Sequence, residues 1–430
     1  MNKRLSVLAM LAGSTAIAQS TSANSADMRS FNPAISVIID GLYYHDNVDG
    51  EGMELLDEHD SAMHSHGHTD HEHGSFGQGF NLRELELTMS GSIDSYFDAY
   101  VTLGLADGEA EIEEAWFQTR SLPMGLTMKG GKLLSAIGYH NEKHLHSWDF
   151  ADQNLAYLSL FGDHGLSDAG VQLSWLAPSS TFLQIGAELL QGSDLEVFGS
   201  SLDGEELADE INEEFGQAID EDDLGLPGRK GPLLNVGYVR VAPDLGTRHA
   251  LQLGASFARH GSQQAFHEEG ADAFVSEGSA NLYGVQVIYK RFATGAYGKG
   301  SFAIQAEAYQ VESDQKVTYH TVPAEIGAPV TLEQQAAYVQ TTWGFAPRWS
   351  AGLRHAAASI NGELVEDGDK EDISGSRQNS VALTWQATEF SRLRLQVNRN
   401  SVATDAGREE FNQIMLQYNM SLGAHGAHTF

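Results

Sequence analysis

Segments of about ten residues in which apolar and polar positions alternate recur along most of the chain. In a β-strand, side chains two residues apart face the same side of the sheet. In residues 35–43, 85–93 and 391–398, and in the closing stretch 411–422, apolar residues occupy one set of alternate positions and polar residues the other. Each set of alternate positions is called a parity below. Each such segment is therefore predicted as a strand with one apolar face, and we count about 16 of them.

The breaks between these segments are alternately short and long. Short, turn-type breaks fall at 93–96, 122–125, 177–180, 242–246, 346–347 and 388–391, and long ones at 46–79, 136–167, 193–230, 261–279, 314–333 and 361–375. Membrane barrels combine short periplasmic turns with longer outer loops. The pattern predicts an all-β fold, a porin-like transmembrane antiparallel β-barrel of about 16 strands with an apolar outer face and a polar, water-filled interior.

The first residues are typical of a signal peptide. Lys3 and Arg4 precede the apolar run 5–11, and Ala16-Ile17-Ala18 forms a small-x-small cleavage site. We predict a signal peptide over 1–18, with an alternative cleavage after 23, a short segment over 19–32 and a single barrel over 33–430. Residues 205–219 are expected to form a short amphipathic helix on the fourth outer loop, and the terminal Phe430 to act as a barrel-assembly signal.

Composition narrows the function. The formal net charge is -34, and the chain has no Cys. Such acidity argues against nucleic acid or an anionic membrane surface as a partner and suits a pore or surface that gathers cations. Without Cys, disulfides and thiolate metal sites are excluded. We find no GxSxG, HExxH, P-loop or GxGxxG motif in a suitable context, so we predict no enzymatic activity.

Seven of the 18 histidines lie between His45 and His73, six of them within the long break 46–79. Acidic residues such as Asp57 and Asp70 accompany them. A His-rich acidic tract indicates binding of divalent metal, because imidazole and carboxylate together suit zinc, copper or nickel. The alternative is a solvated polar loop. The expected metal ligands are His59, His64, His66, His68, His71 and His73.

The third outer loop, 136–167, carries further ligand types. Its residues His140, Glu142, His144 and His146 are predicted to form a metal-selecting constriction, and hydrogen bonding within a packed loop is the alternative. Charged side chains of both signs are expected to face the lumen and to create a transverse field. They are Glu84, Glu86, Asp98, Arg392 and Arg394.

The loop sequence Gly138 to Phe150 and the ending Ser421 to Phe430 resemble a family of gammaproteobacterial zinc-regulated outer-membrane proteins. More distantly, the chain is similar to phosphate/polyphosphate-selective porins, although its acidity argues against an anion-selective pore. Members of the zinc-regulated family are sometimes labelled TonB-dependent receptors, which implies energised zinc uptake. Residues 19–32 are too few for the plug of such a transporter, and about 16 strands are fewer than the 22 of that class.

We therefore expect a channel or receptor in the Gram-negative outer membrane that takes up divalent metal, with Zn²⁺ foremost and no covalent cofactor. One alternative is a non-conducting barrel that serves as a metal-binding or interaction surface. Another is a barrel that works with a TonB-type energised system without a plug. The expected partners are divalent metal ions, outer-membrane lipid and lipopolysaccharide, and the barrel-assembly machinery, and a homo-oligomer is compatible with the pattern.

Overall fold

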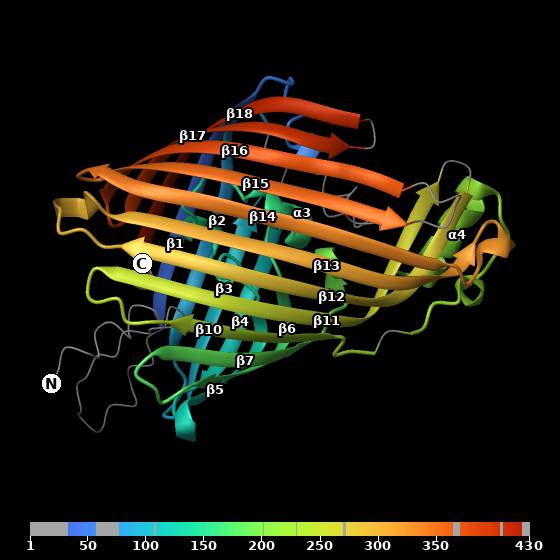
Figure 1. Cartoon of the computed structure of the whole chain (residues 1–430), viewed down its shortest axis with the longest axis horizontal. Coiled ribbons are helices and arrows are strands. Elements are labelled where there is room, and N and C mark those ends of the chain that lie inside the picture. Colours follow the sequence, from blue (N-terminus) through green and yellow to red (C-terminus); the bar gives the residue numbers. More distant parts are fainter. Residues whose placement is uncertain are drawn as a thin grey trace.

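The computed structural model describes residues 33–56, 77–106, 109–200, 202–228, 230–269, 272–363, 370–404 and 407–423. Sixteen antiparallel strands form a closed barrel in which each strand pairs with its sequence neighbours and β1 pairs with β18 (Figure 1). This confirms the predicted fold class. The strands are β1 (Ala34–Asp46), β2 (Gly79–Ser92), β3 (Phe97–Ala106), β4 (Glu109–Thr119), β5 (Leu126–Leu134), β6 (Ser167–Leu176), β7 (Phe182–Leu190), β10 (Leu234–Ala242), β11 (His249–Glu269), β12 (Asp272–Arg291), β13 (Phe302–His320), β14 (Pro329–Ala346), β15 (Trp349–Glu363), β16 (Lys370–Thr388), β17 (Ser391–Thr404) and β18 (Gly407–Gly423).

The outer face of the barrel is apolar, as the alternation predicts. Val285, Val381 and Val397 are exposed on it, and their inward-facing neighbours along each strand are buried. Aromatic side chains mark the turn end of this belt, where Trp349 and Trp385 stack with ring centroids 6.2 Å apart. Such a belt belongs against lipid. No helix among the described residues has the length and apolarity needed to cross a bilayer.

Strands β11 to β14 are longer than the sequence predicts. Each has 18 to 21 residues, whereas about 9–11 are enough to cross a bilayer. The breaks predicted at 261–279 and 314–333 are therefore mostly strand, and the connections shrink to 270–271 and 321–328. The prediction was wrong there because polar residues continue the alternation beyond the membrane.

The strand extensions are stable because the fourth outer loop packs on them. Helix α4 (Gly204–Phe215) matches the predicted amphipathic helix, and Figure 1 shows it at the end of these long strands. Its Leu207 and Ile211 form a cluster with Phe266, Val275 and Tyr319 of the extensions. The same loop contains β8 (Asp194–Leu195), β9 (Gly199–Ser200), η3 (Glu196–Phe198) and η4 (Glu221–Leu224).

The third outer loop occupies much of the interior of the barrel. The third outer loop, here called L3 (residues 135–166), folds into the lumen with its helix α3 (Leu155–Phe161), every residue of which is buried (Figure 1). Leu155 and Phe161 belong to a large apolar cluster that includes Phe198 from the fourth outer loop and Leu282 and Val311 from the wall. The wall keeps the polar inward-facing side chains predicted from the sequence, such as Gln305, Gln340 and Gln396, which bond to L3 beside an apolar core around α3.

Strand β10 shows the consequence for the wall. Its apolar parity, Leu234, Val236 and Tyr238, faces the lumen and is buried, whereas Val239 faces outward. An apolar parity in a barrel strand normally faces lipid. In β10 it instead faces inward, where Leu234 and Val236 pack in the same cluster as α3.

Candidate metal centre at the constriction loop

Local sequence explains how L3 folds. Short stretches with many polar residues and a single glycine, Gly138, separate β5 from η2 (Leu145–Ser147) and α3. Asn154 caps α3 by accepting a hydrogen bond from the Tyr157 backbone N–H, and Gly162 ends the helix at a positive φ of 67°. The apolar run 155–161 can then be buried because the whole helix lies inside the barrel.

One wall carboxylate holds the first half of L3. Glu307 on β13 accepts hydrogen bonds from the Tyr139 and His140 backbone N–H groups at 3.1 and 2.9 Å. It also accepts from the hydroxyls of three buried tyrosines. Charge-assisted bonds of this kind are about twice as strong as neutral ones. The tyrosines are Tyr157, Tyr309 and Tyr338.

Arginines of the wall strands β15 and β17 hold the second half of L3. Arg394 donates to the Trp148 carbonyl at 2.9 Å, and Arg354 lies 2.5 Å from the Asp152 carboxylate. Arg392 donates to the His146 carbonyl. The loop is thus tied to the wall by Arg392 and Arg394, which were predicted to face the lumen, and by Arg354, which was not.

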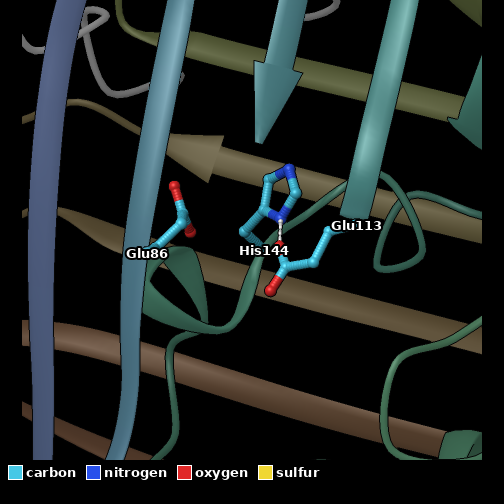
Figure 2. A group of neighbouring side chains, drawn as sticks. All are labelled: Glu86, Glu113 and His144. Atoms are coloured by element: carbon cyan, nitrogen blue, oxygen red, sulfur yellow. Dashed lines mark hydrogen bonds and ion pairs between the residues drawn. The ribbon is translucent and has the colours of Figure 1, made fainter. Parts of the chain in front are cut away.

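A group of metal-ligating side chains lies where L3 meets the opposite wall. Glu86 on β2, Glu113 on β4 and His144 on L3 each offer a ligand atom, and these atoms all lie within 4.8 Å of one another. Figure 2 shows the imidazole between the two carboxylates, which come from separate strands. Nitrogen and oxygen ligands in this number suit a divalent ion such as Zn²⁺, with further ligands nearby. We call this group the seam site.

Two more side chains extend the seam site. The Glu114 carboxylate lies 2.9 Å from His144 Nε2, and His146 Nδ1 lies 2.7 Å from Glu86 Oε2. The rings of His144 and His146 are stacked with an interplanar angle of 5°. The seam site therefore contains two imidazoles and at least three carboxylates from one loop and two strands.

The charge of His144 follows from its contacts. Its Nδ1 is 2.8 Å from Glu113 and its Nε2 faces Glu114, so both ring nitrogens are donors only in the imidazolium form. Burial alone lowers the pKa of His144, but the hydrogen bonds to Glu113 and Glu114 outweigh it and hold the pKa well above its usual value. Without metal, the imidazolium neutralises part of the acidic group.

The four L3 residues predicted as one ligand set lie in different environments. His140 is buried, with Nε2 2.6 Å from Gln153 Oε1 and its ring stacked on Trp148. Burial, followed by the charge of Lys143, lowers the pKa of His140 to about 3. Glu142 pairs with Arg240 at 2.7 Å. Only His144 and His146 of these four reach the seam site, because the loop makes a turn over 140–143, where the Lys143 N–H donates to the His140 carbonyl.

The remaining predicted residues fall into three groups. Glu84, Glu86, Arg392 and Arg394 face the lumen, where Glu84 is buried near the seam site. Asp98 also faces inward, but it lies by the turn end, where it pairs with Arg120 at 3.4 Å. Outside the described residues lie His59, His64, His66, His68, His71, His73 and Phe430.

Strand bulges hid two inward-facing charged residues from the sequence pattern, one of them in the seam site. On β4, Thr102 pairs with Glu114 while Leu103 pairs with Ile112, so Glu113 is the extra residue of a bulge. On β2, Arg83 is extra in the same way, and it contacts Asp40 at 2.7 Å. A bulge shifts side-chain parity by one residue. The broken alternation before Trp116 was the available signal for Glu113.

The fold defines this chain as a porin-like, outer-membrane type of β-barrel. Two solved structures are similar along nearly the whole chain. The outer membrane channel DcaP of Acinetobacter baumannii is 13% identical with a TM-score of 0.51, and the match covers 91% of this chain and 96% of that one. OmpT, an outer membrane protein of Vibrio cholerae, is 9% identical with a TM-score of 0.50, covering 91% and 97%.

Sequence comparison then gives the family. A protein of Aquifex aeolicus (strain VF5), described as an uncharacterized protein, is 33% identical over 410 residues, which cover 94% of this chain and 81% of that protein. The chain belongs to the same family as this protein. No family model matches the chain. The resemblance to zinc-regulated outer-membrane proteins stays a prediction.

Proposed function

We propose that the protein is a channel in the Gram-negative outer membrane for the uptake of divalent metal, zinc foremost. The observation that carries the proposal is the seam site, where Glu86, Glu113 and His144 bring ligand atoms within 4.8 Å of one another inside the barrel. Imidazole and carboxylate ligands favour zinc over magnesium and calcium, which prefer all-oxygen sites.

The acidic exterior would deliver the ion. Helix α4 and η4 carry exposed carboxylates such as Glu205, Glu213 and Asp222 at the outer end, and the His-rich tract is predicted on the first outer loop. Clustered negative charge raises the local concentration of cations. A cation gathered outside would then meet the seam site inside, at the edge of L3.

Passage through the barrel requires L3 to move. Inward-facing side chains such as Gln305, Gln340 and Gln396 are buried at 4, 3 and 0% exposure, which leaves little room for an ion beside the closed loop. The seam site joins L3 to β2 and β4, so a bound cation acts on the contact that closes the lumen. We therefore propose a channel that is closed at rest and opens by displacement of L3.

Zinc binding by the purified barrel tests the proposal. Because the His-rich tract would bind zinc as well, the measurement is made in a variant lacking residues 59–73. We expect that variant to bind zinc more weakly overall than the full chain. Within it, Glu113→Gln combined with His144→Gln is expected to lower the remaining affinity by about tenfold or more, as loss of two ligands implies.

A matched control uses Glu111, two residues away on β4. Its side chain is 57% exposed and pairs with Lys132, away from the seam site. Glu111→Gln should leave zinc binding unchanged. Equal zinc affinity in the double variant and the Glu111→Gln control would refute a metal site at the seam.

One observation favours a second function, a non-conducting barrel that binds metal or a partner at its surface. The apolar cluster around α3 and the buried wall together fill the lumen. Such a protein would bind zinc at the seam site and show no ionic current under any condition. Conductance of the reconstituted barrel separates this function from the proposed channel.

A further inference from the structure

Three exposed arginines gather on the outside of the barrel, on the neighbouring strands β16, β17 and β18. Arg377 pairs across the strands with Ser401, and Arg399 lies two residues before Ser401 on the same face of β17. Arg408 donates a hydrogen bond to Ser401 Oγ at 3.2 Å. Cross-strand partners have Cβ atoms about 5 Å apart, so the three arginines start from neighbouring positions around Ser401 on one face of the sheet.

This arginine cluster begins where the lipid-facing belt ends. Leu353, Val381, Val397 and Ile414 form one continuous cross-strand row, and all four are exposed apolar side chains. The next outward-facing position on β17, towards the outer loops, is Arg399. Two residues of strand advance about 7 Å. The cluster therefore lies at the depth of the outer-leaflet headgroups.

Polar residues beside the arginine cluster add further hydrogen-bonding groups to this surface. His355, Asn379 and Asn412 occupy the same cross-strand row as Arg399. The amides and imidazole offer donors and acceptors for hydroxyl groups. Cationic, hydrogen-bonding and apolar positions thus follow one another from the outer rim to the belt.

The positive charge here is exceptional for this chain. Lys and Arg number 25 against 59 Asp and Glu. Within the cluster, Glu410 lies 3.4 Å from Arg399, with the two side chains 61% and 72% exposed. An exposed ion pair contributes little, so Arg399 remains available to another anion. Elsewhere on the outer face, the cross-strand pair Glu312 and Glu333 is acidic.

We propose that the arginine cluster binds the phosphate groups of the outer-leaflet glycolipid, lipopolysaccharide. Guanidinium groups bind phosphate oxygens through paired, charge-assisted hydrogen bonds. With the phosphates on Arg377, Arg399 and Arg408, the acyl chains lie along the row that contains Val381 and Val397. The proposal concerns the outer wall and is independent of the function proposed for the lumen.

The test is binding of purified bisphosphorylated lipid A to the folded barrel in detergent, followed by native mass spectrometry. We expect the triple variant Arg377→Gln, Arg399→Gln and Arg408→Gln to bind lipid A at least about tenfold more weakly. A matched variant, Arg248→Gln with Arg291→Gln, removes two exposed arginines at the turn end of the barrel and should bind normally. Heat-modified gel migration establishes that every variant is folded.

Two further probes identify the ligand group. Lipid A without phosphates should bind the wild type as weakly as intact lipid A binds the triple variant. Phosphatidylglycerol should bind more weakly than lipid A, because it presents one phosphate rather than two. Unchanged lipid A binding by the triple variant, or equal binding of lipid A and either control lipid by the wild type, would overturn the proposal.

Discussion

At Gly138, L3 lies close against the wall. A Cβ atom there would overlap the hydroxyls of Tyr157 and Tyr309 and the carboxylate of Glu307. We predict that Gly138→Ala forces L3 away from β13 while the barrel still assembles. Lys143 lies in the same loop and offers a cleavage site for trypsin. Cleavage after Lys143 should be slow in the wild type and fast in the variant.

The control for that substitution lies on β10. A Cβ at Gly237 would meet no atom within 4 Å. Gly237→Ala should therefore leave L3 as resistant to trypsin as in the wild type. Equal protection of Gly138→Ala and wild type would show that L3 tolerates the added methyl group and is not tightly held by Glu307.

The histidine at position 140 gives the closed loop a pH dependence. Its pKa is about 3 in the closed state, against an ordinary value of about 6.5 once L3 is released. A lowered histidine pKa favours the neutral form, so its contribution to closure is full above about pH 6.5 and is lost as the pH falls towards 3. We predict that Trp148, stacked on His140, reports loop opening by a fluorescence change over this range.

His140→Phe provides the comparison, because phenylalanine keeps an aromatic ring and has no titrating group. The fluorescence of this variant should change less between pH 6 and 4 than that of the wild type. A wild-type signal that is flat over that range, or a variant with the full change, would exclude His140 as the source.

At the scale of elements, helix α3 closes the lumen mainly through apolar contacts. Leu155 is fully buried within the large cluster. Leu→Ala changes at such sites cost about 2–5 kcal/mol through lost contacts and the cavity left behind. We predict that Leu155→Ala speeds hydrogen exchange in α3 and trypsin cleavage of L3 without unfolding the wall.

A leucine of the other outer-loop helix is the matched control. Leu207 of α4 is 5% exposed and belongs to the separate cluster on the strand extensions. Leu207→Ala should loosen α4 and leave L3 protected. If both variants expose L3 equally, the two loops form one cooperative unit and α3 has no independent role in closure.

Alternation along the chain predicted the elements well wherever one face meets lipid. Strands such as β1, with exposed Ile35 and Ile39 beside buried Asp40, follow the rule directly. It failed where the burying partner is distant in sequence. Leu234 faces inward because of L3 and the fourth loop, and Tyr139 bonds to Glu307, 168 residues away. No local pattern contains those pairings.

The candidate site shows the same limit. The sequence identified His144 and His146 as metal ligands in the third loop and Glu86 as a lumen charge, but not their meeting point. Glu113 was missed because a bulge places two successive residues opposite one partner. Residue types were thus predictable, and their grouping required the path of L3 through the barrel.

At the scale of the whole molecule, a lipid-facing exterior encloses a filled interior. The wall alone would leave a pore, since barrels of 16 strands normally enclose an aqueous channel. Here L3 and the fourth outer loop contribute the core that fills it. Acidic side chains dominate the described outer end of β12 to β14 and α4, so a released lumen should favour cations over anions.

Ionic current through single barrels in a planar bilayer, under a zinc chloride gradient, tests this view most directly. We predict rare, small currents for the wild type and steady currents for Gly138→Ala. In both proteins, the sign of the reversal potential should show that Zn²⁺ rather than Cl⁻ carries the current. Steady wild-type currents equal to those of Gly138→Ala, or a reversal potential set by chloride, would contradict a loop-closed channel for divalent cations.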